Sequence, residues 1–177
     1  MLSKLFVSKL LILLVFFISC NTDEKSDSSK QNNQKLQKES LIKVNKYLIN
    51  SENLDIDNYI RRHNLTVIET GSGVKYQIIK QGTGEKTQRD KIVTLEYRVK
   101  LITGDIIYSS DKTGPKQFKI GHGGVESGLE EAILNMRVGD NSIIIIPSHL
   151  AYGLLGDNNK IPSRSTIIYE IELTNIN

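Results

Sequence analysis

The feature that most constrains the fold is an alternation of apolar and polar residues along Ile92–Ile102. Side chains on a β-strand point to opposite faces in turn, so this pattern predicts a strand with one buried face. The run Asn141–Ile146 is rich in β-branched residues and predicts a strand that is buried on both faces. Shorter segments of similar character, separated by turn residues, predict further strands at Leu65–Glu69, Val74–Lys80, Ile106–Tyr108, Phe118–Ile120 and Ser165–Asn175.

One short helix is predicted among these strands. Ser127 and Glu130 fit the S-x-x-E capping box, and Leu129, Ile133 and Met136 would then share one apolar face. Strands joined by hairpins around a single helix predict an α+β fold, in which a curved antiparallel sheet of about five strands wraps around the helix.

The first 20 residues have the layout of an export signal. Two lysines precede an apolar run at residues 10–18, which is too short to cross a bilayer core, since a spanning helix needs about 20 residues. The phrase Phe17-Ile-Ser-Cys20 looks like a bacterial lipobox. We therefore predict a lipoprotein signal peptide at residues 1–19 and lipidation of Cys20. An ordinary cleaved secretory signal and an uncleaved amino-terminal anchor are the alternatives.

The charge balance argues against nucleic acid as a partner. The chain has 23 Lys and Arg against 20 Asp and Glu, and two of the lysines belong to the predicted signal peptide. Nucleic-acid binding favours a compact basic block interleaved with aromatic residues, and the sequence contains no such block. Cys20 is the only cysteine. Because no internal disulfide can form, the domain must depend on its hydrophobic core.

The segment between the signal peptide and the strands divides into two parts. Residues 20–40 are almost entirely polar or charged, which predicts a flexible tether, although the acids just after Cys20 are alternatively a sorting signal. Residues 41–64 have helical spacing of apolar residues with a break near residues 50–53, and Asp55 is placed to cap a second short helix. These helices either pack on the main domain or form a spacer before it. The main domain is then residues 65–177.

Four motifs in the main domain resemble those of FKBP-type peptidyl-prolyl cis-trans isomerases. In chain order they are Val125–Ala132, Pro147–Gly153, Lys160–Pro162 and Tyr169–Leu173. Residues 73–173 can be laid along such a domain without large gaps. The resemblance implies an FKBP-like curved antiparallel β-sheet wrapped around one short α-helix, here with a helical N-terminal extension. The whole layout is also similar to FKBP-type lipoproteins associated with gliding motility in some bacteria.

The resemblance also implies which residues form the substrate pocket. In the family, the backbone N–H at the Glu126 position holds the carbonyl before proline, and the hydroxyl at the Tyr152 position donates to the neighbouring backbone. The proline ring sits on the side chain at the Leu129 position. By strand pattern alone, Tyr97 and Tyr169 are read instead as core or rim tyrosines. Carried over by position, the catalytic residues are Tyr97, Ile107, Val125, Glu126, Leu129, Tyr152, Ile161 and Tyr169, and the further pocket wall is Phe118 and Tyr108.

Several positions depart from the commonest family pattern. Leu129 stands where tryptophan is frequent, Tyr108 replaces an aspartate, and Glu126 replaces an aliphatic side chain. Lys116 and Lys160 replace an aromatic and an aliphatic residue. These changes predict a wetter and shallower pocket that binds macrolide-type inhibitors weakly.

The function implied by the resemblance is rotation about the peptide bond before proline in clients of the bacterial cell envelope. The enzyme would be held at the membrane by a lipid on Cys20. The reaction cleaves no bond, so no cofactor, nucleophile or metal is implied, and His63, His122 and His149 lack paired metal-ligand spacing. The alternative is a non-catalytic module that holds a proline-containing segment within an envelope assembly such as a gliding motility machine.

Overall fold

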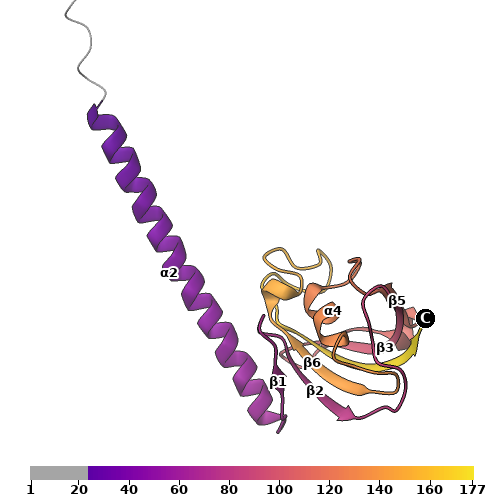
Figure 1. The fold of residues 1–177 in the computed structure, drawn as a ribbon. Helices are drawn as coiled ribbons and strands as arrows, with labels where there is room; N and C mark the ends of the chain where they lie inside the picture. Colours follow the sequence, from indigo (N-terminus) through magenta and orange to yellow (C-terminus); the bar gives the residue numbers. More distant parts are fainter. Residues whose placement is uncertain (1–23) are drawn as a thin grey trace, which may run out of the picture. The chain divides into compact units, whose positions relative to one another are not determined.

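The computed structural model describes residues 24–177, so the predicted signal peptide and Cys20 lie outside the described residues. Helix α2 (Glu24–Arg62) comes first in chain order, and the strands follow it (Figure 1). The chain divides into two compact units, Met1–Leu48 and Ile49–Asn177. The last part of α2 therefore belongs to the same unit as the strands.

Helix α2 differs from the sequence prediction. A single helix of 39 residues takes the place of a flexible tether and two short helices, and the break near residues 50–53 is not observed. Asp55, expected as a cap, lies inside the helix. The segment contains neither glycine nor proline, so nothing in it interrupts the backbone hydrogen bonds of a helix. Among the helices of residues 24–177, none is both long enough and apolar enough to cross a bilayer.

Within the described residues, seven strands form one antiparallel sheet. Each overlaps one of the seven segments predicted as strands, although the sheet was expected to contain only about five of them. Their order is β1-β2-β6-β7-β3-β4, and β5 also pairs with β3. The predicted α+β architecture is confirmed, with a curved sheet against one short helix, α4 (Ser127–Ile133) (Figure 1). The strands are β1 (Ile68–Glu69), β2 (Lys75–Lys80), β3 (Ile92–Leu101), β4 (Ile106–Ser109), β5 (Lys116–Lys119), β6 (Asn141–Ile146) and β7 (Ile167–Ile176).

The start of α4 shows that the predicted capping box is wrong. Glu126 is the N-cap residue, and no side chain caps the helix. Glu130 Oε1 instead accepts hydrogen bonds from the backbone N–H groups of Gly121 at 3.2 Å and Gly123 at 3.1 Å. The carboxylate is therefore used to hold the loop before the helix. Two further short elements were not predicted, α3 (Ser110–Thr113) and the 3₁₀ turn η2 (Ser148–Leu150).

The sheet carries an apolar cluster on each of its faces. The larger cluster contains the buried side of α4, including Leu129 and Ile133, packed against inward-facing residues of the sheet. The smaller cluster joins Ile56 and Tyr59 of α2 to Ile145 and Ile168. Because Ile144 and Ile146 belong to the larger cluster and Ile145 to the smaller, β6 is buried on both faces, as predicted.

Candidate active site

The predicted site residues come from six separate parts of the chain, and the apolar and aromatic ones all belong to the larger apolar cluster or pack against it. Phe118, Leu129, Ile161 and Tyr169 are buried in that cluster. The partly buried residues packed against it include Tyr97, Ile107, Tyr108, Val125 and Tyr152. The structure thus brings all the predicted apolar and aromatic site residues together, and Glu126 joins them through a hydrogen bond to Tyr169.

Leu129 is more deeply placed than the resemblance implies. Its side chain is 0% exposed, and that of Tyr169 is 1% exposed. The surface that an incoming ring meets first is formed by the partly exposed residues, among them Tyr97, Val125 and Tyr152. Contact between a client ring and Leu129 therefore requires the side chains above it to move.

Two tyrosines and a lysine form one wall of the site. The rings of Tyr97 and Tyr169 have centroids 6.2 Å apart and are tilted by 47°. Lys116 Nζ lies 5.4 Å from the Tyr97 ring centroid and 5.8 Å from that of Tyr169, a range in which a cation is attracted to the ring face. The lysine that replaces an aromatic residue of the family pattern therefore still lies against this wall, but brings a positive charge to it.

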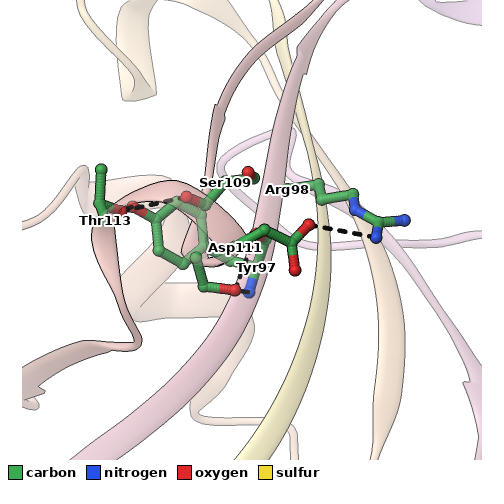
Figure 2. Close-up of polar contacts among 6 residues, drawn as sticks. Tyr97, Arg98, Ser109, Asp111 and Thr113 are labelled. Atoms are coloured by element: carbon green, nitrogen blue, oxygen red, sulfur yellow. Dashed lines mark hydrogen bonds and ion pairs between the residues drawn. The ribbon is translucent and has the colours of Figure 1, made fainter.

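Tyr97 is fixed in place by the short helix α3. Its hydroxyl lies 2.8 Å from Thr113 Oγ1, and its backbone N–H donates to Ser110 Oγ at 3.0 Å (Figure 2). The neighbouring Arg98 points to the other side of β3, where it pairs with Asp111 at 3.3 Å. The contacts to α3 on both sides of β3 hold the ring of Tyr97 at the rim of the site.

A buried carboxylate adjoins the aromatic wall. Glu126 is only 8% exposed. Its Oε1 accepts a hydrogen bond of 2.9 Å from the Tyr169 hydroxyl. That hydroxyl also lies 3.5 Å from Lys116 Nζ. The three residues therefore form a chain of contacts from the lysine through the tyrosine to the carboxylate. This chain connects Lys116 and Glu126, two residues that depart from the family pattern.

The tyrosine hydroxyls near Glu126 are held in their neutral form. Burial, followed by the charge of Glu126, raises the pKa of Tyr169 well above its ordinary value. Burial also raises the pKa of Tyr152, and the nearby Glu126 carboxylate raises it further. Both hydroxyls therefore keep their protons at neutral pH, and that of Tyr169 is donated to Glu126.

Residues 148–166, which we call the site loop, carry Tyr152 and Ile161 and are organised by Asp157. Its Oδ1 accepts from the N–H of Ile161 at 2.7 Å and of Asn159 at 2.9 Å, and its Oδ2 accepts from the Tyr108 hydroxyl. Burial acts to raise the pKa of Asp157, but these hydrogen bonds outweigh it and lower the pKa. Although Tyr108 replaces the aspartate of the family pattern, a carboxylate still lies beside this position.

Helix α2 holds the base of the site loop through a single carboxylate. Glu52 Oε1 accepts from the Ser148 N–H at 2.6 Å and from Thr166 Oγ1 at 2.6 Å, while Ser148 Oγ donates to Oε2 at 2.9 Å. Ser148 begins the loop and Thr166 ends it. Glu52 therefore fastens both ends of the site loop to α2.

Sequence reasoning missed Glu52 and Asp157. Glu52 is 96 residues from Ser148 and 114 from Thr166, and no local pattern marks a contact over such a separation. The run Asp157-Asn-Asn159 does carry a local signal, because Asp and Asn favour turns in which the side chain accepts from backbone N–H groups shortly after it.

A hollow of about 550 Å³ lies across β3, β6 and β7, and Tyr97 is the one predicted site residue in its lining. Its lining includes the charged residues Glu96, Arg98, Glu170 and Glu172. Such a surface is well hydrated and does not remove water from an amide. Within residues 24–177, no group of three or more His, Cys, Asp or Glu side chains is placed to hold a metal ion.

The curved sheet around one short helix, with several tyrosines at the larger apolar cluster, defines a small α+β domain with an apolar candidate site. Residues 83–174 match the family model described as FKBP-type peptidyl-prolyl cis-trans isomerase. The chain belongs to this family, whose members catalyse rotation about the bond before proline, and the predicted fold and enzyme class are confirmed.

Individual relatives agree with the family match. A probable FKBP-type peptidyl-prolyl cis-trans isomerase FkpA of Neisseria meningitidis is 36% identical over 108 residues, which cover 60% of this chain and 39% of the relative. The outer membrane protein MIP of Legionella longbeachae is 33% identical over 111 residues, which cover 62% and 47%. The chain thus spans less than half the length of either relative. The crystal structure of FkpA from Escherichia coli shares the fold with a TM-score of 0.63 and 22% identity, covering 99% of this chain and 82% of that one.

Proposed function

We propose that the apolar candidate site is where this protein accelerates rotation of peptidyl-prolyl bonds in extended, proline-containing clients. The observation that carries the proposal is the meeting of Tyr97, Tyr152, Ile161 and Tyr169 beside the start of α4. The family match supports the same reading. It also favours an enzyme over the alternative of a non-catalytic binding module.

The chemistry that the site must supply is modest. A peptide bond rotates over a barrier of about 18–20 kcal/mol, because the planar amide is stabilised by resonance. A thousandfold acceleration requires a reduction of only about 4 kcal/mol. The planar amide is polar and well hydrated, whereas the twisted amide has lost resonance and part of its carbonyl polarity. An apolar site therefore disfavours the starting state relative to the transition state, without any covalent intermediate.

Each group has a role in this mechanism. The ring of proline lies against the partly exposed Tyr97, Val125 and Tyr152, and contacts the buried Ile161 once these side chains move. The backbone N–H of Glu126 holds the carbonyl that precedes proline. The Tyr152 hydroxyl, which is protonated at neutral pH, donates a further hydrogen bond to the client backbone. One or two such bonds contribute about 1 kcal/mol each, and removal of water from the amide supplies the remainder.

The test follows cis-trans exchange of an X-Pro peptide by NMR, with residues 21–177 of the chain as the enzyme. We expect acceleration by this protein and at least a tenfold loss when Tyr152→Phe is combined with Ile161→Ala. The outer-face change Glu172→Gln serves as the control, because Glu172 is exposed and lies away from the site. Exchange that is not accelerated, or that is unaffected by the double change, would favour a binding module.

We further propose that the protein is anchored by a lipid on Cys20 and acts in the bacterial envelope. The basic start, apolar centre and lipobox-like residues 17–20 support this proposal, and a relative named as an outer membrane protein is consistent with it. Two acyl chains suffice for stable anchoring, since each buried methylene contributes about 0.8 kcal/mol. Incorporation of labelled palmitate should be lost in Cys20→Ala. Incorporation that persists in this variant contradicts lipidation at Cys20.

The similarity to gliding-motility lipoproteins supports a narrower proposal, in which the clients belong to a motility assembly. Its test is the spreading of bacteria that carry Tyr152→Phe with Ile161→Ala in place of the native residues. Normal spreading, together with normal amounts of the protein, would place the clients elsewhere in the envelope.

A further inference from the structure

The carboxylate of Glu126 has one oxygen whose hydrogen-bonding capacity is unused. Glu126 is 8% exposed, and Oε1 accepts from the Tyr169 hydroxyl at 2.9 Å. Oε2 is buried and has no hydrogen-bond partner among the residues that the structure describes. The same carboxylate lies close enough to Tyr152 to contribute to its raised pKa. An unpaired acceptor therefore lies inside the cluster that forms the proposed active site.

Such an atom is energetically unfavourable unless a donor reaches it. A buried charged group without a full set of hydrogen bonds destabilises its surroundings much more than a neutral one does. Oε2 itself is shielded from water in the free protein, so only a donor that comes in from a neighbouring side chain or from a client can satisfy it. An aliphatic client brings no such donor.

The ammonium group of Lys116 does not supply the donor that Oε2 lacks. Lys116 Nζ lies 3.5 Å from the Tyr169 hydroxyl and against the rings of Tyr97 and Tyr169. It reaches the carboxylate only through Tyr169, on the side of Oε1. Two donors can therefore satisfy Oε2: the nearby Tyr152 hydroxyl, which interacts with the same carboxylate, or a group that a client brings into the site.

We infer that Glu126 makes this protein select prolyl segments in which the residue before proline carries a hydrogen-bond donor, such as glutamine or lysine. The inference rests on the proposed function, in which the backbone N–H of Glu126 holds the carbonyl of that residue. Its side chain is then the part of the client closest to the Glu126 carboxylate. Aliphatic residues and glutamate at this position are disfavoured, because the first offers no donor and the second adds a like charge.

The test compares four peptides that differ only in the residue before proline, namely leucine, glutamine, lysine and glutamate. The measured quantity is kcat/KM for cis-trans exchange by NMR. We expect the glutamine and lysine peptides to exceed the leucine peptide by about tenfold, the effect of a hydrogen bond to a charged acceptor. In Glu126→Val the order should reverse, with leucine preferred. Glu126→Gln should lose most of the lysine preference and keep part of the glutamine preference.

A matched control removes a charge of the same sign elsewhere. Glu172→Gln lies on β7 and is exposed, so it should leave the order of the peptides unchanged. If it alters the order as Glu126→Val does, the preference is a general effect of net charge and the inference is wrong. Equal rates for leucine and glutamine peptides in the native protein would also overturn it, since Oε2 would then be satisfied by Tyr152.

Binding measurements separate this inference from the proposed function. Chemical-shift titration gives Kd for the same four peptides without requiring catalysis. If no peptide is accelerated but glutamine and lysine peptides bind more tightly than the leucine peptide, the enzymatic proposal fails and the selection by Glu126 stands. If exchange is accelerated equally for all four, the enzyme assignment stands and the selection fails.

Discussion

Two charged residues of the site replace apolar residues of the family pattern, and both contact the same tyrosine. Lys116 and Glu126 stand where the family pattern has apolar side chains, and each contacts the Tyr169 hydroxyl. The positive and negative charges are thus joined through one neutral group. This arrangement explains how the site tolerates two charged residues close to its apolar centre.

Two glycines of the site loop provide a residue-scale prediction. Gly153 and Gly156 both have positive φ, at 62° and 72°, but a Cβ at Gly153 would meet nothing within 4 Å. A Cβ at Gly156 would lie 2.1 Å from the carbonyl oxygen of Ile161. Gly153→Ala should therefore lower the free energy of unfolding by about 1 kcal/mol, from backbone strain alone. Gly156→Ala should lower it by about 3 kcal/mol, because the backbone must also move.

Denaturant unfolding measures the stability of both variants, and peptide exchange measures their activity. Because Ile161 must shift in Gly156→Ala, this variant should also lose most of its acceleration under conditions where it is fully folded. Gly153→Ala is the internal control. Equal stabilities for the two variants would mean that the loop relaxes freely around residue 156.

At the scale of elements, the attachment of the site loop to α2 predicts a specific effect of Glu52. In Glu52→Ala, the N–H of Ser148 and the hydroxyl of Thr166 lose their acceptor while remaining buried. We expect a loss of about 2–4 kcal/mol in the free energy of unfolding. We also expect faster amide hydrogen exchange within residues 148–166 than in β3 and β7.

Two other variants show whether the carboxylate itself is responsible. Glu52→Gln keeps one acceptor oxygen and should retain about half of the lost stability. Asp55→Ala removes an exposed carboxylate from the same helix and should change stability by no more than about 0.5 kcal/mol. If amide exchange in Glu52→Ala increases equally throughout the sheet, the effect is global and the loop is not specifically held.

The elements that sequence patterns predicted well are those with a clear local pattern, either alternation of apolar and polar residues or a continuous β-branched run. The bounds of β6 were predicted as observed, and β3 and β7 were within two residues at each end. The candidate site residues were predicted from the family resemblance, since Tyr97 and Tyr169 on their own look like ordinary strand tyrosines. The role of Glu130 was misread, because its partners at Gly121 and Gly123 belong to a loop whose path the sequence does not determine. Contacts such as Glu52 to Thr166 depend on the complete fold.

At the scale of the whole molecule, the structure places a boundary inside α2 rather than at the first strand. The compact unit that contains the sheet begins at Ile49, whereas the sequence predicted a main domain from residue 65. The difference arises because Ile56, at 0% exposure, and Tyr59, at 5%, pack against Ile145 and Ile168. Apolar residues earlier in α2, such as Leu41 and Tyr47, are exposed.

This boundary makes a prediction about truncated chains. Residues 49–177 should unfold with the same free energy as residues 21–177, within about 0.5 kcal/mol, because no side chain of residues 32–48, where burial is described, is buried. Residues 65–177 lose Glu52, Ile56 and Tyr59, and uncover Ile145 and Ile168. Since burial of each large apolar side chain contributes about 1.5–3 kcal/mol, this shorter chain should be less stable by at least about 3 kcal/mol.

Ile56→Ala within residues 49–177 should reproduce about 2–4 kcal/mol of the loss. Denaturant titration of the four proteins measures these differences. A chain of residues 65–177 as stable as residues 49–177 would show that the end of α2 is dispensable, and that the domain begins at the strands after all.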